Sequence, residues 1–208
     1  MIFEKGHLYH IYNQGNNHDK LYYNRQDYLL FMKKIRKYII PYADILAWCL
    51  MPNHFHLMVQ IISTEITIKH KESTDCKNSK KRTLNSSIAI MLRSYTRIID
   101  QEQERVGSLF RQKTKAVCLD PADGFAPVWY KLSGLTKLNY QFPEFQYPQI
   151  CFNYIHNNPV DSRLVKDISS WEFSSAPEIL GLVKSRIANK QKILELGLKL
   201  SIENEPAL

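Results

Sequence analysis

The sequence is poor in cysteine, glycine and proline. Its 208 residues include 4 Cys, 7 Gly and 9 Pro. No two cysteines stand in the CxxC spacing typical of a zinc site or a disulfide framework, so all four are expected to be reduced thiols. The few glycines and prolines follow no period, which excludes a collagen-like or low-complexity chain.

Long apolar runs are also missing. The longest apolar stretches, such as residues 45–50, are far shorter than the about 20 residues that a membrane-spanning helix needs. Polar residues, among them Glu4, His7 and Asn13, interrupt the N-terminal 15 residues, so no secretion signal is expected. We therefore expect a soluble, cytoplasmic protein without a membrane partner.

What the chain does contain is enough apolar material for a core. Hydrophobic residues make up 44% of the sequence and aromatic residues 12%, which excludes wholesale disorder and favours one domain with elaborations. The 28 Lys and Arg against 20 Asp and Glu give a net charge of +8. This charge is compatible with a nucleic-acid partner, but by itself it decides nothing.

The order of the expected elements is that of a ferredoxin-like domain, an α+β fold with an antiparallel sheet, helices on one face and further C-terminal helices. Two strands joined by a Met-Pro-Asn turn predict a hairpin. The expected strands cover residues 8–12, 44–51, 55–62 and 108–119, and the expected helices cover residues 27–40 and 84–103.

Three further segments complete the expected organisation. Residues 69–82 form a basic run without apolar periodicity and are predicted to be a surface insertion loop, whereas residues 121–148 are an irregular insertion rich in proline and aromatics. A short helix is expected over residues 149–157, ending at Pro159, and a final helix over residues 177–198.

A His-Phe-His triplet marks the second strand of the hairpin. Because side chains alternate across a strand, His54 and His56 project from one face while Phe55 points into the core. Two imidazoles side by side on a rigid element suit a metal site. Such a triplet is common by chance, however, and two ligands are too few for a tight site.

A third ligand and a nucleophile are available on the helix that ends near residue 158. Tyr154 and Asn158 are spaced i, i+4 and so share a helix face, and an amide oxygen is an acceptable ligand for Mg²⁺ or Mn²⁺. Asn158 precedes Pro159 and is therefore expected to cap the helix. The alternative for Tyr154 is a half-buried core tyrosine.

Four blocks together resemble the REP-associated tyrosine transposases, which belong to the single-tyrosine branch of the HUH endonucleases. The resemblance spans residues 6–165 in the right order. The blocks are Tyr-His-Ile-Tyr-Asn-Gln-Gly-Asn-Asn at 9–17, Leu-Met-Pro-Asn-His-Phe-His-Leu at 50–57, Gly-Ser-Leu-Phe at 107–110 and Tyr-Ile-His-Asn-Asn-Pro-Val at 154–160.

The resemblance implies a ferredoxin-like catalytic domain, here residues 1–175, followed by a helical extension over residues 176–208. It implies that His54 and His56, helped by Asn158, hold Mg²⁺ or Mn²⁺. Tyr154 matches the nucleophile, which forms a 5′-phosphotyrosine with single-stranded DNA. Tyr95 is rejected as the nucleophile because its spacing with Leu92 and Ile99 assigns it to an apolar helix face.

The expected DNA-binding residues are mostly basic. Lys113 and Lys115 share one face of the expected strand and, with Arg111, are predicted to follow a phosphate backbone. Gln14 and Asn16 lie in the first family block, and Gln14 stands where family members often have a basic residue. Four aromatic residues are candidates for stacking on bases: Tyr9, Tyr12, Trp48 and Trp129.

The favoured hypothesis is a metal-dependent endonuclease and strand transferase acting on hairpin-forming single-stranded DNA. The alternatives are a domesticated protein that binds hairpins without cleaving them, and a metal-dependent enzyme acting on small phosphoesters. A homodimer and association with the nucleoid are compatible with the resemblance. Whether Tyr154 acts on histidines of its own subunit is open at this point, and His156, on another helix face, is not assigned as its base.

Overall fold

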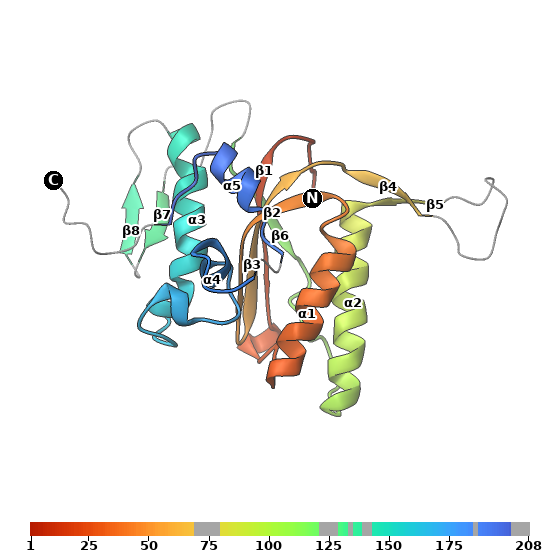
Figure 1. The fold of residues 1–208 in the computed structure, drawn as a ribbon. Coiled ribbons are helices and arrows are strands. Elements are labelled where there is room, and N and C mark those ends of the chain that lie inside the picture. The colour runs from red at the N-terminus through yellow and green to blue at the C-terminus, as the bar shows by residue number, and fades with distance from the viewer. Residues whose placement is uncertain (69–79, 121–128, 133–134, 139–142, 185–186, 201–208) are drawn as a thin grey trace.

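The computed structural model describes residues 1–68, 80–120, 129–132, 135–138, 143–184 and 187–200 (Figure 1). Its centre is a four-stranded antiparallel sheet in the order β2-β3-β1-β6. The strands are β1 (Leu8–Gln14), β2 (Ala43–Met51), β3 (His54–Ile61) and β6 (Lys115–Cys118). This sheet and its helices confirm the predicted α+β, ferredoxin-like class.

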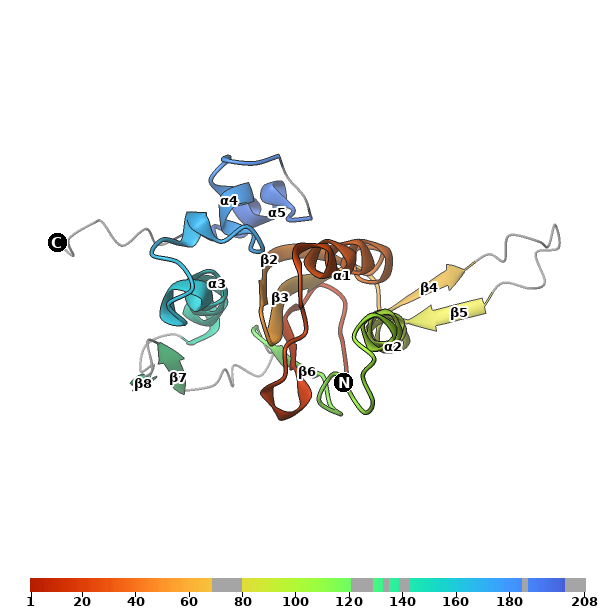
Figure 2. The same cartoon turned by 90° about the horizontal axis from the view of Figure 1, so that it is seen from below.

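Two helices cover one face of the sheet (Figure 2). In α1 (Arg25–Tyr38) a capping box of Asn24 and Asp27 satisfies the first backbone N–H groups. Thr83 caps α2 (Leu84–Glu102). The rings of Phe31 on α1 and Phe55 on β3 lie 5.1 Å apart, so the core forms between these helices and the sheet.

The helix α3 (Pro143–Asp161) packs on the opposite face (Figure 2). It is longer than the expected helix at both ends and continues through Pro159, so the prediction that Asn158 caps it is wrong. Phe152 and Ile155 are completely buried against the sheet. This packing outweighs the tendency of a residue before proline to leave the helical region.

The expected strand over residues 108–119 is formed only by β6, whose register with β1 covers four residue pairs. Upstream of it, the Asn13 side chain donates hydrogen bonds to the Arg111 carbonyl and to the Thr114 hydroxyl. The Arg111 N–H still donates to the Gln14 carbonyl, so the side-chain bonds replace the ladder only between Arg111 and Lys115. Arg111 and Lys113 consequently lie outside the strand, and the prediction that Lys113 shares a strand face with Lys115 is wrong.

The expected helix over residues 177–198 is replaced by two short helices, α4 (Ala176–Ile179) and α5 (Lys190–Glu195). Gly181 follows α4 with a φ of 78°, a left-handed conformation that ends helices. The chain then runs along β2, where the Asn189 N–H donates to the Ile45 carbonyl. A short helix, η3 (Ile168–Ser170), precedes this region.

Two strand pairs lie at the expected insertions, and residues 80–82 of the predicted loop belong to a strand. The strands β4 (Glu65–Ile68) and β5 (Lys80–Thr83) form an arm that extends from the domain, and residues 69–79 of the basic insertion lie outside the described residues (Figure 1). Within the stretch predicted to be irregular, β7 (Trp129–Leu132) pairs with β8 (Leu135–Leu138). In the described part of the chain, no helix has the length and apolarity to cross a membrane.

Candidate metal and nucleophile site

A pocket of about 680 Å³ lies where the ends of β1 and β3 meet α3. The antiparallel register pairs Gln14 with His54 and Tyr12 with His56. These side chains therefore emerge on the face of the sheet that α3 covers. Its lining is Tyr12, Asn13, Gln14, His18, Lys20, Met51, Pro52, Asn53, His54, His56, Tyr154, Ser162 and Leu164.

Both histidines of the triplet have their Nδ1 atoms in hydrogen bonds. His54 Nδ1 lies 2.7 Å from Asn53 Oδ1, and His56 Nδ1 lies 2.8 Å from His10 Nε2. Asn53 can only accept at its oxygen, so His54 carries its proton on Nδ1 and its Nε2 is a bare lone pair. Ligating histidines typically donate their second ring nitrogen in this way.

The Nε2 atoms face the positions where a cation would be held. His56 is only 5% exposed, and its Nε2 has no hydrogen-bond partner among the described residues. His54 Nε2 lies 3.3 Å from Asn158 Oδ1, so two acceptors face each other. The buried Asn158 Nδ2 likewise has no partner in the described part of the chain.

This donor set fits a divalent cation. Two imidazole nitrogens and one amide oxygen are ligands that Mn²⁺ accepts, and the amide oxygen also suits Mg²⁺. A cation between them would satisfy the bare His56 Nε2 and separate the facing acceptors of His54 and Asn158. The residues present therefore fit the metal that the sequence resemblance implies.

Burial keeps the imidazoles of this site neutral. It lowers the pKa of His10 to about 3 and that of His56 well below 6.5. The pKa of His54 is lowered by burial too, although the nearby Asn158 oxygen, which would accept from a protonated ring, raises it in part. Only a neutral imidazole can ligate a metal, so these shifts keep the ligands available below neutral pH.

Tyr154 on α3 lies beside the same histidines. Its ring centroid is 5.4 Å from that of His56 and 6.1 Å from that of His10, in one and the same chain. Burial raises the pKa of its hydroxyl, and the nearby Asn158 amide lowers it in part. Tyr154 is half-buried and lines the pocket, so this residue combines access with proximity to the histidines.

Two of the expected DNA-binding residues meet at the rim of this pocket. The side chain of Gln14 hydrogen-bonds to His18 Nδ1, and Arg111 Nη2 lies 3.2 Å from His18 Nε2. The other three are placed differently. Lys115 Nζ lies 5.9 Å from the Tyr12 ring centroid, Asn16 begins η1 (Asn16–His18), and Lys113 is exposed without lining the pocket.

The stacking candidates separate by burial. Trp48 and Tyr9 are 0% and 4% exposed, so the prediction that they stack on bases is wrong. Trp48 faces the core, where its indole N–H donates to Glu178. Tyr12 is half-buried at the pocket and stays a candidate, while the Trp129 side chain lies outside the described residues.

Two other side chains occupy structural positions. The buried Tyr95 hydroxyl donates to the Leu21 carbonyl, which agrees with its rejection as the nucleophile. His156 is buried between the Phe152 carbonyl, 2.8 Å from Nδ1, and the Ser175 hydroxyl, 2.7 Å from Nε2. It connects α3 to the residue before α4.

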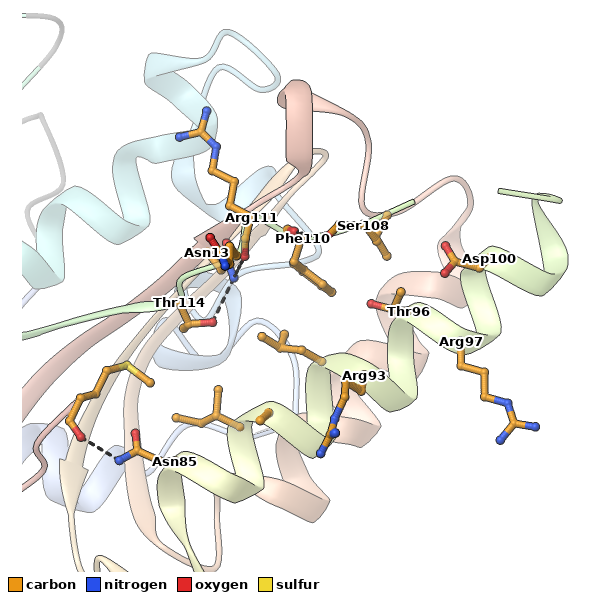
Figure 3. Close-up of a pocket in the computed structure, with 16 residues that line it drawn as sticks. Asn13, Asn85, Arg93, Thr96, Arg97, Asp100, Ser108, Phe110, Arg111 and Thr114 are labelled. Atoms are coloured by element: carbon orange, nitrogen blue, oxygen red, sulfur yellow. Dashed lines mark hydrogen bonds between the residues drawn. The ribbon is translucent and has the colours of Figure 1, made fainter. Parts of the chain in front are cut away.

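A second pocket of about 680 Å³ lies on the face covered by α2 (Figure 3). Arg93 and Arg97 line it from α2, and residues 108–112 line it from the other side. In Figure 3 the Arg111 side chain points away from these two arginines. Asn13 of β1 lines both pockets, so the two pockets lie on either side of this residue.

Sequence reasoning missed the residues that orient the histidines. His10 and Asn53 hold the two Nδ1 atoms, and His18 and Lys20 line the pocket. His10 belongs to the first of the four sequence blocks, residues 9–17, and alternation along β1 puts it on the same face as Tyr12. Only the pairing of β1 with β3 reveals that this is also the face of His56.

The fold and the site define a class: a ferredoxin-like α+β domain in which a His-x-His strand faces a tyrosine on a helix. The structure is similar to a solved structure of a REP-associated tyrosine transposase bound to a REP hairpin. The similarity covers 91% of this chain and 89% of that chain, with 16% sequence identity and a TM-score of 0.52. At this identity the likeness establishes a shared fold. The sequence matches no protein-family model and no curated protein.

Proposed function

We propose that the protein cleaves and rejoins single-stranded DNA with Tyr154 as nucleophile and with Mg²⁺ or Mn²⁺ held by His54, His56 and Asn158. One observation carries the proposal. The Tyr154 ring lies 5.4 Å from that of His56, whose buried Nε2 is unpartnered among the described residues. The shared fold with a hairpin-bound tyrosine transposase supports the same reading.

The chemistry needs a nucleophile and a way to neutralise phosphate charge. A bound divalent cation would supply Lewis-acid stabilisation of the scissile phosphate. The Tyr154 oxygen attacks phosphorus, and the bond from phosphorus to the 3′-oxygen breaks. The phenolic proton passes to solvent, and the departing 3′-oxygen takes a proton from solvent. The products are a 5′-phosphotyrosine and a free 3′-hydroxyl, and attack by another 3′-hydroxyl reverses the step on a new partner.

The proposed substrate is hairpin-forming DNA, as in the complex of the structural neighbour. The net charge of +8 favours a polyanion. We assign backbone contacts to Arg111, Lys113 and Lys115, and polar contacts to Gln14 and Asn16. Arg111 and Gln14 both contact His18 at the pocket rim, so they would hold the strand next to the scissile bond.

We further propose that Tyr154 acts in cis, within a catalytic domain of residues 1–175 extended by residues 176–208. The tyrosine and the histidines converge within one chain, so a second subunit is not required to complete the site. A homodimer would then serve to synapse two DNA ends rather than to assemble the chemistry. DNA binding would bring the protein to the nucleoid.

The test is formation of a covalent adduct. Incubation with single-stranded hairpin DNA and Mn²⁺ should give a protein–DNA species that survives denaturing electrophoresis. Tyr154→Phe should abolish the adduct while hairpin binding is retained. Tyr147→Phe, which changes another half-buried tyrosine of α3, is the matched control and should form the adduct. An adduct with Tyr154→Phe would show that the nucleophile is another residue.

A hairpin-binding protein that does not cleave is the second candidate. The observation that favours it is the raised pKa of the Tyr154 hydroxyl, which burial holds in its protonated, weakly nucleophilic form. This candidate predicts hairpin binding without an adduct in wild type under Mg²⁺ and Mn²⁺ alike. Wild-type adduct formation in either metal excludes it.

A further inference from the structure

A second cluster of potential metal ligands lies far from the site described above. His7, Cys118 and Asp120 each offer one ligand atom, and these atoms lie within 4.8 Å of one another. The three side chains are half-buried. The cluster sits at the start of β1 and the end of β6, whereas His54 pairs with Gln14 at the opposite end of β1.

The strand register explains why these residues meet. Tyr9 pairs with Cys118, and the Leu119 N–H donates to the Leu8 carbonyl, so the ladder continues to bring His7 opposite Asp120. Cys118 and Asp120 are two residues apart and therefore share one face. That face is the one carrying Tyr9 and not the one carrying His10 and His56.

The distances match the edges of a tetrahedral zinc site. His7 Nδ1 lies 3.5 Å from Asp120 Oδ1, and Cys118 Sγ lies 3.6 Å from the same oxygen. Zinc bond lengths place a nitrogen and an oxygen ligand about 3.4 Å apart in a tetrahedron, and a sulfur and an oxygen ligand about 3.6 Å apart. Both measured edges thus need almost no rearrangement.

The carboxylate is already oriented for such a role. The Leu8 backbone N–H donates to Asp120 Oδ1 at 2.7 Å, which fixes the carboxylate at the end of the ladder. His7 Nδ1 also lies 3.1 Å from the Asp120 carbonyl oxygen, which can only accept, so ligation through Nδ1 requires the proton to move to Nε2. Glu4 approaches the other ring nitrogen, Nε2, at 3.7 Å.

We propose that His7, Cys118 and Asp120 form a separate site for a borderline divalent transition metal of the Zn²⁺ class, with water as the fourth ligand. A thiolate, a carboxylate and a neutral imidazole would balance the charge of the ion. Binding releases the thiol proton to solvent. The ion would join β1 to the edge strand β6, which carries Lys115 beside Tyr12.

Co²⁺ titration tests this proposal, because Co²⁺ occupies tetrahedral zinc sites and absorbs visibly. The protein used is the His54→Ala, His56→Ala double variant, in which the first site cannot bind. One equivalent of Co²⁺ should produce intense tetrahedral d–d bands and a near-ultraviolet thiolate charge-transfer band, and excess Zn²⁺ should remove both. Absence of the charge-transfer band at one equivalent overturns the proposal.

Two variants assign the thiolate and the imidazole in the same background. Cys118→Ser should abolish the charge-transfer band, and His7→Gln should weaken Co²⁺ affinity by at least about tenfold. Cys151→Ser, which changes a buried thiol of α3 that is not part of the cluster, should retain the full spectrum. Circular dichroism establishes that each variant is folded. A charge-transfer band that persists in Cys118→Ser, or an unchanged affinity in folded His7→Gln, also overturns the proposal.

Discussion

His10 Nε2 lies 2.8 Å from His56 Nδ1, and both rings are buried. Because burial lowers the pKa of both imidazoles, the pair is neutral, and one ring donates while the other accepts. If His56 presents its unpartnered Nε2 to a cation, its proton must sit on Nδ1 and be donated to His10. His10 is therefore a positioning residue for His56.

The first prediction concerns this positioning. His10→Leu removes the acceptor and leaves the His56 Nδ1–H unpaired, so Mn²⁺ affinity should fall on the order of 10- to 100-fold. His10→Gln restores an acceptor oxygen and should recover part of the loss. The measurement is Mn²⁺ binding followed by electron paramagnetic resonance in the Cys118→Ser background. Equal affinities for wild type and His10→Leu would contradict the role.

The second prediction concerns acid stability. Burial lowers the pKa of His156 to about 4 and that of His10 to about 3. The unfolded chain, with histidine pKa values near 6.5, binds more protons, so stability is full above that pH and falls as the pH drops towards the folded pKa. At pH 5 each of these two histidines should lower the free energy of unfolding by about 2 kcal/mol relative to neutral pH.

Urea unfolding at pH 7.5 and pH 5, with a chelator present, measures this loss. His156→Gln cannot titrate, so its free energy of unfolding should depend less on pH than that of wild type, by about 2 kcal/mol between these two values. The comparison is between pH values within each protein, so a general loss of stability in the variant does not affect it. The same pH dependence in both proteins would refute the assignment.

The third prediction concerns DNA binding at the pocket rim. Arg111→Gln removes a cation near His18, so hairpin affinity should fall and the slope of log K against log salt concentration should decrease by about one. Lys33→Gln is the control, because it removes the same single positive charge from the exposed side of α1. Fluorescence anisotropy at several salt concentrations gives both slopes. Arg111 has no phosphate contact if the two variants behave alike.

The fourth prediction concerns the C-terminal segment. The buried Glu178 accepts hydrogen bonds from the Trp48 indole and from the backbone N–H groups of Ile187 and Ala188. Glu178→Ala leaves these donors unpaired and should destabilise the protein by about 3 kcal/mol or more.

Glu178→Gln keeps one acceptor oxygen and should cost less than the alanine variant. Glu195→Ala, on the exposed surface of α5, is the matched control and should be nearly neutral. Chemical denaturation of all three variants provides the comparison. A neutral Glu178→Ala would mean that the C-terminal segment adds little to the stability of the domain.

Local periodicity made much of the fold predictable. The helical spacing of apolar residues identified α1 and α2, and the Met-Pro-Asn turn identified the β2–β3 hairpin. Three expected elements differ from the structure: the helix over residues 177–198 is replaced by α4 and α5, and the ends of the other two depend on distant partners. Side-chain bonds from Asn13 shortened β6, and packing of Phe152 and Ile155 carried α3 through Pro159.

In the candidate site, too, local periodicity predicted some relationships and tertiary contacts determined the others. The sequence by itself determined which side chains share a face: His54 with His56, because strands alternate, and Tyr154 with Asn158, because helices repeat every 3.6 residues. Only the tertiary structure decided that these pairs face each other, that His10 orients His56, and that Trp48 is buried. It also brought His7 to Cys118 and Asp120. Strand register and packing across a sheet join residues distant in the chain, and no local pattern records them.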